Sequence, residues 1–317
     1  MPETRIGISG WRYEPWRGGF YPPKLPQNQE LHFASRALNS IELNGTFYSL
    51  QRPGSYRAWY DDTPDEFVFS VKGGQFITHI LRLNNVAEPL CNFYASGLLL
   101  LKEKLGPILW QFPPNFIFDE EKFANFFALL PHDTQKMAEL AERHGKAITK
   151  DREWLQTDKK RPVRHAVEIR HESFCTDHFV TLLRKHHIAL VIADTARRFP
   201  YLEDITADFV YARLHGDEEL YASGYTDEAL GKWAAKFKAW QAGDEPPDAR
   251  RVTERMKKLS KGRDLFIYFD NDIKVRAPFD AMSLAKRLGV GIDFDQVKSE
   301  AVDSGRPKKP KPKRRKK

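Results

Sequence analysis

Charged and polar side chains recur along this sequence at the ends of short β-type runs, where they could bind an anion or transfer protons. Because side chains alternate along a strand, Glu168 and Arg170 share one face of their strand, and so do Arg213 and His215. Any one of these residues could form only a structural ion pair. A succession of buried ionisable groups, however, lowers stability unless the groups pair with one another or with a ligand. The charged and polar residues at the ends of the β-type runs are Glu42, Asn44, Lys72, Gln111, Glu168, Arg170, Asp194, Arg213, His215, Asp270 and Asn271.

The basic members of this set suit the binding of a phosphate or a carboxylate. An arginine can donate two parallel hydrogen bonds to such an anion, whereas a lysine offers a compact point charge. A neighbouring carboxylate or imidazole could then transfer protons as a general acid or base. The candidate anion-binding residues are Lys72, Arg170, Arg213 and His215, and the candidate catalytic residues are Glu42, Glu168, His215 and Asp270.

A divalent metal is a second interpretation of the same strand ends. Oxygen ligands with one imidazole suit Mg²⁺, Mn²⁺ or Zn²⁺. Ion pairs with the neighbouring arginines would satisfy the carboxylates equally well, so the sequence leaves a metal cofactor open without requiring one. The candidate ligands are Glu168, Asp194, His215 and Asp270.

Aromatic residues crowd the segments that follow the first two β-type runs. Trp11 lies in the first segment, and Tyr48 lies in the second, four residues after Asn44. These rings could form a lid or a stacking wall for a sugar or a base, or they could pack on one another as a rigid loop. The candidate substrate-binding residues are Trp11, Asn44, Tyr48, Lys72, Gln111, Arg170, Arg213 and Asn271.

The elements that must position these side chains alternate between β-type runs and helical patterns, as in β-α units around a parallel sheet. Eight strands are predicted, at Arg5–Ser9, Ser40–Leu43, Phe67–Val71, Pro107–Phe112, His165–Arg170, Ala189–Asp194, Phe209–Leu214 and Leu265–Phe269. Helices are predicted at Gln29–Leu38, Ser55–Tyr60, Val86–Leu105, Glu120–Leu130, Thr134–Leu155, Phe174–His187, Asp227–Gln241 and Pro278–Leu288. This series favours a TIM-type (β/α)8 barrel with helical insertions, whose active site lies where the strands end. An open sheet is the alternative, because periodicity does not reveal strand order.

The net charge of the chain, +8, is concentrated at its C-terminus. Residues Arg306–Lys317 contain nine Lys or Arg and no acid, which leaves the rest of the chain with a net charge of −1. Such a segment repels itself and has no apolar surface to bury, so we expect a disordered tail over residues 298–317 after one barrel domain at residues 1–297. The tail could bind nucleic acid non-specifically through phosphate groups.

The cysteines and the first residues indicate a cytoplasmic protein. Cys91 and Cys175 lie too far apart for a short-spaced zinc site or a disulfide framework. The N-terminal residues have neither the apolar stretch of a signal peptide nor the pattern of a transit sequence. No run approaches the roughly 20 apolar residues that a membrane helix needs.

Several motifs resemble, in order along the chain, those of the YecE-like family, also called the domain-of-unknown-function 72 family. They are G-x-S-G-W-x-Y-x-x-W with F-Y-P (Gly7 to Pro22), I-E-L-N-G-T-F-Y (Ile41 to Tyr48), F-V-F-S-V-K (Phe67 to Lys72) with Thr78-His79, L-G-P-I-L-W-Q-F-P-P (Leu105 to Pro114), V-E-I-R-H-E-S-F (Val167 to Phe174), Y-A-R-L-H-G (Tyr211 to Gly216) and Y-F-D-N (Tyr268 to Asn271). The resemblance implies a TIM-type barrel with these motifs at its C-terminal mouth, and it implies no activity. The chain departs from the family's pattern where Asp270 replaces the first Asn of a final Phe-Asn-Asn and where Phe174 replaces a Trp.

These observations predict an enzyme, a hydrolase or an isomerase, that acts on a small polar or anionic ligand such as a sugar-like, phosphorylated or nucleotide-derived compound. A nucleic-acid-associated protein that uses the tail and the aromatic mouth is one alternative. A binding protein without catalysis, whose charged side chains form only internal ion pairs, is the other. The sequence makes no prediction of the oligomeric state.

Overall fold

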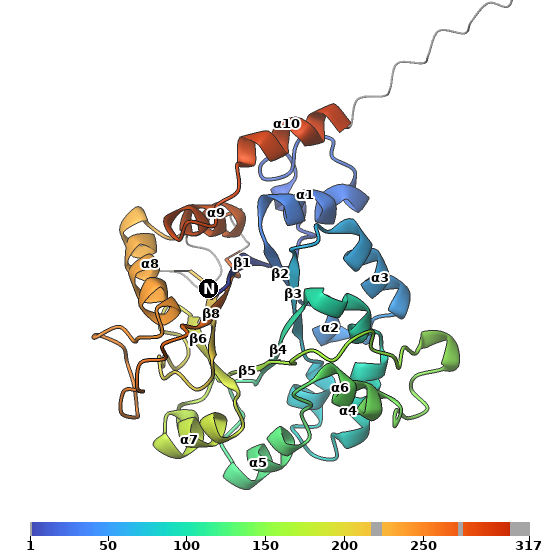
Figure 1. Cartoon of the computed structure of the whole chain (residues 1–317), viewed down its shortest axis with the longest axis vertical. Helices are drawn as coiled ribbons and strands as arrows, with labels where there is room; N and C mark the ends of the chain where they lie inside the picture. The colour runs from blue at the N-terminus through green and yellow to red at the C-terminus, as the bar shows by residue number, and fades with distance from the viewer. Residues whose placement is uncertain (1, 217–223, 272–274, 305–317) are drawn as a thin grey trace, which may run out of the picture.

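The protein, described from a computed structural model, is a closed barrel of eight parallel strands (Figure 1). The structure describes residues 2–216, 224–271 and 275–304. The barrel closes because β1 (Thr4–Ser9) pairs with both β2 (Ser40–Leu43) and β8 (Asp264–Phe269). The other strands are β3 (Val68–Lys72), β4 (Leu105–Gln111), β5 (His165–Glu168), β6 (Ala189–Asp194) and β7 (Phe209–Leu214). The predicted TIM-type barrel is confirmed, and the open-sheet alternative is excluded.

The strands form where short, mostly apolar runs can be buried on both faces. On β7 and β3 every residue is buried, because side chains alternate between the barrel interior and the layer under the helices. The bounds differ from the prediction by up to two residues: β4 begins at Leu105 rather than Pro107, and β5 ends at Glu168 rather than Arg170. Arg170 therefore lies in the loop after β5, as the second residue beyond the strand.

Helices and short helical turns surround the barrel (Figure 1). They are η1 (Glu14–Trp16), η2 (Gln27–Gln29), α1 (Glu30–Ala37), α2 (Gly45–Tyr48), α3 (Pro53–Asp62), η3 (Phe76–Ile80), α4 (Ala87–Ala95), η4 (Leu98–Lys104), α5 (Glu120–Ala128), α6 (Thr134–Ala141), η5 (Lys150–Arg152), η6 (Glu172–Phe174), α7 (Asp177–Lys185), α8 (Asp227–Gln241), α9 (Ala277–Arg287) and α10 (Phe294–Ser304). In the described part of the chain, none of these helices is both long enough and apolar enough to cross a lipid bilayer.

The single helix predicted over 86–105 is wrong, because the chain breaks at Gly97. This residue has a φ of 121°, which only glycine adopts readily, so α4 ends at Ala95 and a separate 3-10 segment begins at Leu98. A Cβ at Gly97 would lie 2.8 Å from the Tyr56 ring. The close approach of α3 therefore fixes the break, and apolar periodicity alone does not reveal it.

The long helix predicted over 134–155 is also wrong, since α6 ends at Ala141. The backbone nitrogen of Gly145 donates to Oδ1 of Asn92 over 2.7 Å, and Nε2 of His144 lies 2.7 Å from Oε2 of Glu153. These contacts turn the chain back on itself. The charged composition of residues 142–155 is typical of a solvent-exposed helix face. In the structure, however, the polar groups of this segment form contacts that hold it as a loop.

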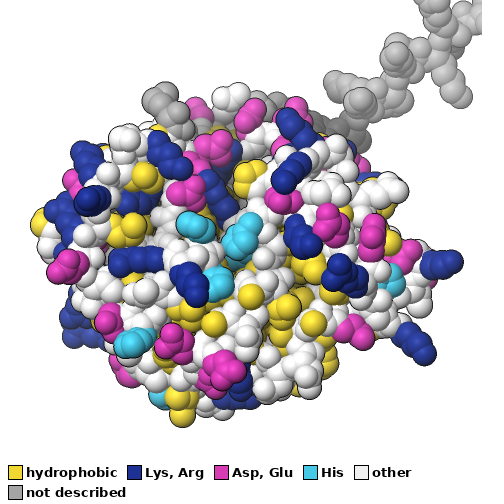
Figure 2. Space-filling model, turned by 60° about the horizontal axis from the view of Figure 1, so that its bottom comes forward, with side chains coloured by type: hydrophobic (Ala, Val, Ile, Leu, Met, Phe, Trp, Pro, Cys, Tyr) yellow, Lys and Arg dark blue, Asp and Glu magenta, His cyan; other side chains and the backbone are white. Residues whose placement is uncertain are grey.

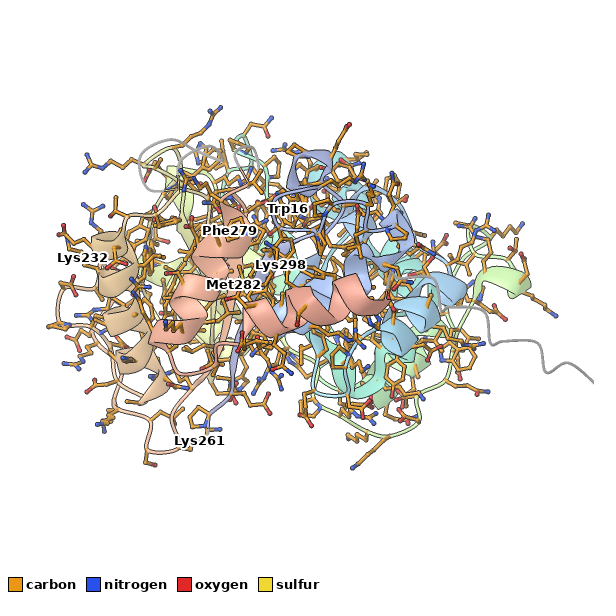
Figure 3. The ribbon with its side chains drawn as sticks, turned by 90° about the horizontal axis from the view of Figure 1, so that it is seen from above. Trp16, Lys232, Lys261, Phe279, Met282 and Lys298 are labelled. Carbon is orange, nitrogen blue, oxygen red and sulfur yellow. The ribbon has the colours of Figure 1, made fainter. Side chains whose placement is uncertain are left out.

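Helix α10 packs on the outside of the barrel beside α1 (Figure 1), and Figure 3 shows Lys298 on α10 near Phe279 on α9. The ring of Phe294 stacks on that of Phe20, with centroids 5.6 Å apart. This helix continues to Ser304, past the boundary that the sequence places after residue 297. The basic segment Arg306–Lys317 lies outside the described residues.

Candidate functional site

Alternation along the strands stacks the side chains of the barrel interior in layers. Along β7, Phe209, Tyr211 and Arg213 occupy successive levels toward the C-terminal mouth, and all three are buried. In the middle layer the rings of Tyr211 and Tyr268 lie 5.2 Å apart, and the Tyr211 hydroxyl is 2.7 Å from that of Ser70. This hydroxyl layer forms the floor under the charged residues of the mouth.

Arg213 ties together three carboxylates at the mouth, a set that we call the Arg213 network: Arg213, Glu42, Glu168 and Asp270. Its Nε and Nη2 donate to the two carboxylate oxygens of Glu42 over 3.0 and 2.8 Å. Its Nη1 donates to Glu168 over 2.7 Å, and Nη2 also donates to Asp270 over 2.8 Å. Because the Arg213 side chain is only 1% exposed, water screens these attractions little.

The carboxylate of Glu42 is saturated with donors. Besides Arg213, it accepts hydrogen bonds from the hydroxyls of Ser9, over 2.9 Å, and Tyr211, over 2.6 Å. Four hydrogen bonds therefore reach its two oxygens. In this geometry Glu42 orients the guanidinium of Arg213.

Glu168 is similarly surrounded. Its Oε1 accepts from Nε2 of Gln111 and from Nε of Arg170, each over 2.8 Å, while Oε2 accepts from Arg213. Burial alone would raise the pKa of this carboxyl, but the charges of Arg170 and Arg213 outweigh burial and hold the pKa well below its usual range. Glu168 is thus a fixed negative charge at neutral pH.

Asp270 forms the more accessible edge of the network, with 16% of its side chain exposed. Its Oδ2 lies 3.1 Å from Nδ1 of His215, which is fully buried. Burial opposes ionisation of Asp270, but Arg213 and His215 favour it and lower the pKa to about 2. The carboxylate and the imidazole form a pair that could pass a proton between them.

Lys72 ends β3 at the same mouth, and it forms no ion pair with a carboxylate in the described ranges. Its Nζ lies 4.4 Å from the centre of the Phe47 ring, and the residue is 8% exposed. Burial and the positive charge of Arg213 outweigh the attraction of the nearby acids and lower the pKa of the Lys72 amine to about 8. A substantial share of this amine is therefore neutral in mildly basic solution.

His79 stands next to this lysine, although the sequence did not single it out as a site residue. Its ring lies edge-on to Phe47, with centroids 5.0 Å apart, and Nδ1 is 2.8 Å from Oγ1 of Thr78. Burial and the charge of Lys72 lower the pKa of His79 to about 4, so the imidazole is neutral at neutral pH. The Thr78-His79 motif after β3 was the signal that could have identified it.

Two predicted ligand-binding residues, Trp11 and Asn44, line a cavity of about 410 Å³ beside the loops after β1 and β2. The rings of Trp11 and Trp59 meet edge to face across 5.8 Å. Oδ1 of Asn44 is buried and has no hydrogen-bond partner among the described residues. Tyr48, by contrast, is 71% exposed and does not line this cavity.

Asp194 and Asn271 form hydrogen bonds with residues outside the Arg213 network. Oδ2 of Asp194 accepts from the Tyr225 hydroxyl over 2.9 Å, and Asn271 donates to Asp280 over 2.9 Å. Asp194 also borders a second cavity, of about 700 Å³, on the β6 side of the barrel. Among residues 2–216, 224–271 and 275–304, no three His, Cys, Asp or Glu side chains are arranged to hold a metal ion.

The surface outside the mouth shows no segregation of charge on the face in Figure 2, where acidic and basic side chains are interspersed. This distribution agrees with the net charge of −1 for the chain without its last twelve residues. The concentration of ionisable groups at the mouth is therefore local and does not follow from the overall charge.

A family model described as "Protein of unknown function DUF72" matches residues 5–302 of the chain. The UPF0759 protein YunF of Bacillus subtilis is 31% identical over 124 residues, which are 38% of this chain and 43% of that protein. The chain thus matches less than half the length of this curated relative.

Two solved structures share the fold. A DUF72 family protein of Thermotoga maritima has a TM-score of 0.67 at 24% identity, covering 90% of this chain and 99% of that one. A DUF72 family protein of Enterococcus faecalis has a TM-score of 0.63 at 17% identity, covering 92% and 97%. Their similarity supports the barrel and leaves the chemistry to the residues of the mouth.

Proposed function

The chain belongs to the DUF72 family of proteins of unknown function, and from its geometry we propose that it is an enzyme whose substrate is a small anion bound at the C-terminal mouth. The observation that carries this proposal is the contrast between two neighbouring cations. Arg213 is held by three carboxylates, whereas Lys72 is buried beside them and forms no ion pair with any residue that the structure describes. A buried amine with no carboxylate partner is costly unless it serves a ligand or a reaction.

The second cation of the proposed anion site is Arg170. Its Nε is fixed by Glu168, and its guanidinium lies 4.7 Å from the ring centre of Phe199. These two contacts set the plane of the guanidinium, which favours recognition of a planar or tetrahedral anion. Lys72 would supply the point charge and Arg170 the directed hydrogen bonds.

We assign proton transfer to the pair formed by Asp270 and His215, because Asp270 lies at the more accessible edge of the network and the buried His215 imidazole stands directly behind it. Glu42 and Glu168 would act through Arg213 and Arg170, whose positions they fix. General acid and base catalysis by such a pair suits both hydrolysis and isomerisation.

The cavity beside Trp11 supports a ligand with a sugar-like or similar polar ring. An aromatic ring packs against the apolar face of a sugar, and the buried Oδ1 of Asn44 is an acceptor that a ligand hydroxyl could satisfy. The volume of this cavity, about 410 Å³, is within the usual range for small-molecule sites.

Titration with inorganic phosphate tests the anion site directly. Calorimetry on the full chain should detect binding, and Lys72→Met and Arg170→Met should each weaken it at least about tenfold, because each removes one cation. Lys136→Met, on the exposed face of α6, is the matched control and should bind as the parent protein does. Unchanged phosphate binding in both mouth variants would contradict the proposal.

Turnover separates an enzyme from a binding protein. A panel of sugar phosphates, nucleotides and keto acids would be incubated with the chain and followed by mass spectrometry. Loss of one compound in the parent protein but not in Asp270→Asn supports catalysis. Phosphate binding without conversion of any anion in the panel would instead support the non-catalytic alternative.

A further inference from the structure

We propose that the ε-amine of Lys72 forms a covalent imine with an aldehyde or ketone, so that the substrate is an anionic carbonyl compound. This inference rests on the proposed function, since the anion site would hold the substrate against the amine. It goes further by naming the two groups that react, which are the amine of Lys72 and the carbonyl group of the substrate.

The surroundings of Lys72 are those of a nucleophilic amine. Lysines become nucleophiles when they are desolvated or placed next to another cation. Lys72 meets both conditions: it is 8% exposed over the Phe47 ring, and the buried Arg213 lies nearby at the same mouth. The acids that could have paired with it are instead engaged by Arg213.

The backbone around Lys72 is fixed in a way that would aim the amine. Oγ1 of Thr46 lies 2.7 Å from the carbonyl oxygen of Leu43 and 2.7 Å from that of Lys72. These two contacts join the ends of β2 and β3. The next residue, Gly73, packs so closely on Trp110 that a Cβ would lie 2.3 Å from its ring. Thr46 also lies in α2, the short helical turn that places the Phe47 ring beside the amine.

The lowered pKa of Lys72, about 8, agrees with this geometry. At pH 7 an amine with this pKa is roughly one-tenth neutral, whereas an ordinary lysine is neutral in fewer than about one molecule in a thousand. Attack on a carbonyl carbon requires the neutral amine.

The reaction balances with the groups present. The amine nitrogen of Lys72 bonds to the carbonyl carbon, and the carbonyl oxygen takes one proton from that nitrogen. The neutral imidazole of His79, which shares the Phe47 ring with the amine, is placed to carry this proton. A second proton from solvent converts the hydroxyl into water, which leaves, and the nitrogen keeps one hydrogen in the protonated imine.

Reductive trapping with glyoxylate, a small anionic aldehyde, tests the inference. The full chain would be treated with glyoxylate and cyanoborohydride near about pH 7.5, and modified peptides would be located by mass spectrometry. We expect Lys72 to be modified at least about tenfold faster than the exposed Lys136, and inorganic phosphate to slow the reaction at Lys72 only. Modification of Lys72 at the rate of Lys136 or slower would overturn the inference.

Lys72→Arg separates this inference from the anion site on which it rests. Arginine keeps the positive charge but forms no imine, so this variant should still bind inorganic phosphate and should lose the fast trapping. If the parent protein binds phosphate but Lys72 is not trapped, the imine fails while the anion site stands. If it binds no phosphate either, both fail. Because trapping is mapped in the parent protein, the result does not depend on the folding of any variant.

Discussion

The hydroxyl of Tyr211 donates to Oε2 of Glu42 over 2.6 Å, and neither side chain has contact with solvent. This bond connects the hydroxyl layer of the barrel with the Arg213 network above it. Since the same carboxylate also accepts two hydrogen bonds from Arg213, β2 and β7 are joined across the interior. The charged mouth is therefore a fixed arrangement, in which a change at one residue acts on the others.

Replacing Arg213 with methionine should severely destabilise the protein. The substitution keeps an apolar stem but leaves the buried carboxylates of Glu42 and Glu168 without their shared cation. Removing one partner from a buried charge network costs about 3–5 kcal/mol. Urea denaturation of the parent and variant proteins measures this difference.

The matched control is Lys136→Met, which breaks an exposed ion pair with Glu139 on α6. Exposed pairs of this kind contribute at most about 1 kcal/mol. If the free energy of unfolding falls no more in Arg213→Met than in this control, the Arg213 network does not stabilise the fold.

The strand-end positions of the site residues could be predicted from the sequence, because alternation puts Arg213 and Tyr211 on one face of β7, and Glu168 lies near the end of the strand predicted at His165–Arg170. The pairing among them could not. It depends on strand tilt and register around the closed barrel, which bring Glu42 and Asp270 to Arg213 but leave Lys72 over Phe47. Nothing in the local sequence distinguishes these two cations.

His79 and the helix breaks show what else local patterns could not predict. His79 follows Lys72 by seven residues, and only the π-helical turn η3 brings it back to Phe47. The break at Gly97 depends on contact with α3, and the loop after α6 depends on Asn92 of α4. In each case a distant segment overrides the local preference.

As the pH is lowered, the free energy of unfolding should fall more steeply in the parent protein than in Glu168→Gln. The pKa of Glu168 lies well below the ordinary value of 4.5, so its contribution to stability is present above that value. It is lost as the pH falls below 4.5 toward the pKa in the folded protein, because the unfolded chain binds the proton first. The unfolding free energy of the variant, measured by urea denaturation across this range, should fall less steeply. Glu121→Gln on α5 serves as the exposed control, and an equal slope in all three proteins would contradict the prediction.

Gly73→Ala should disturb the mouth, since the added methyl group would collide with Trp110. We expect a loss of about 1–3 kcal/mol in the unfolding free energy, as for other overpacked sites. Gly231→Ala, in the middle of α8 with nothing within 4 Å of the new Cβ, should instead stabilise by about 0.5–1 kcal/mol. Thermal melting of both variants gives the sign, and a stabilised Gly73→Ala would refute the close packing behind Lys72.

Asp270→Asn should lower the pKa of Lys72 below its present value of about 8. The charge of Asp270 favours the protonated amine, so its removal leaves the repulsion of Arg213 less opposed. Competitive acetylation across a pH series, with the Lys72 peptide quantified by mass spectrometry, reports the midpoint at which the amine becomes reactive. The midpoint should move to lower pH in Asp270→Asn and stay in place in Glu228→Gln, which removes an exposed acid on α8. An upward shift would mean that Asp270 acts on Lys72 chiefly by holding Arg213 and not by its own charge.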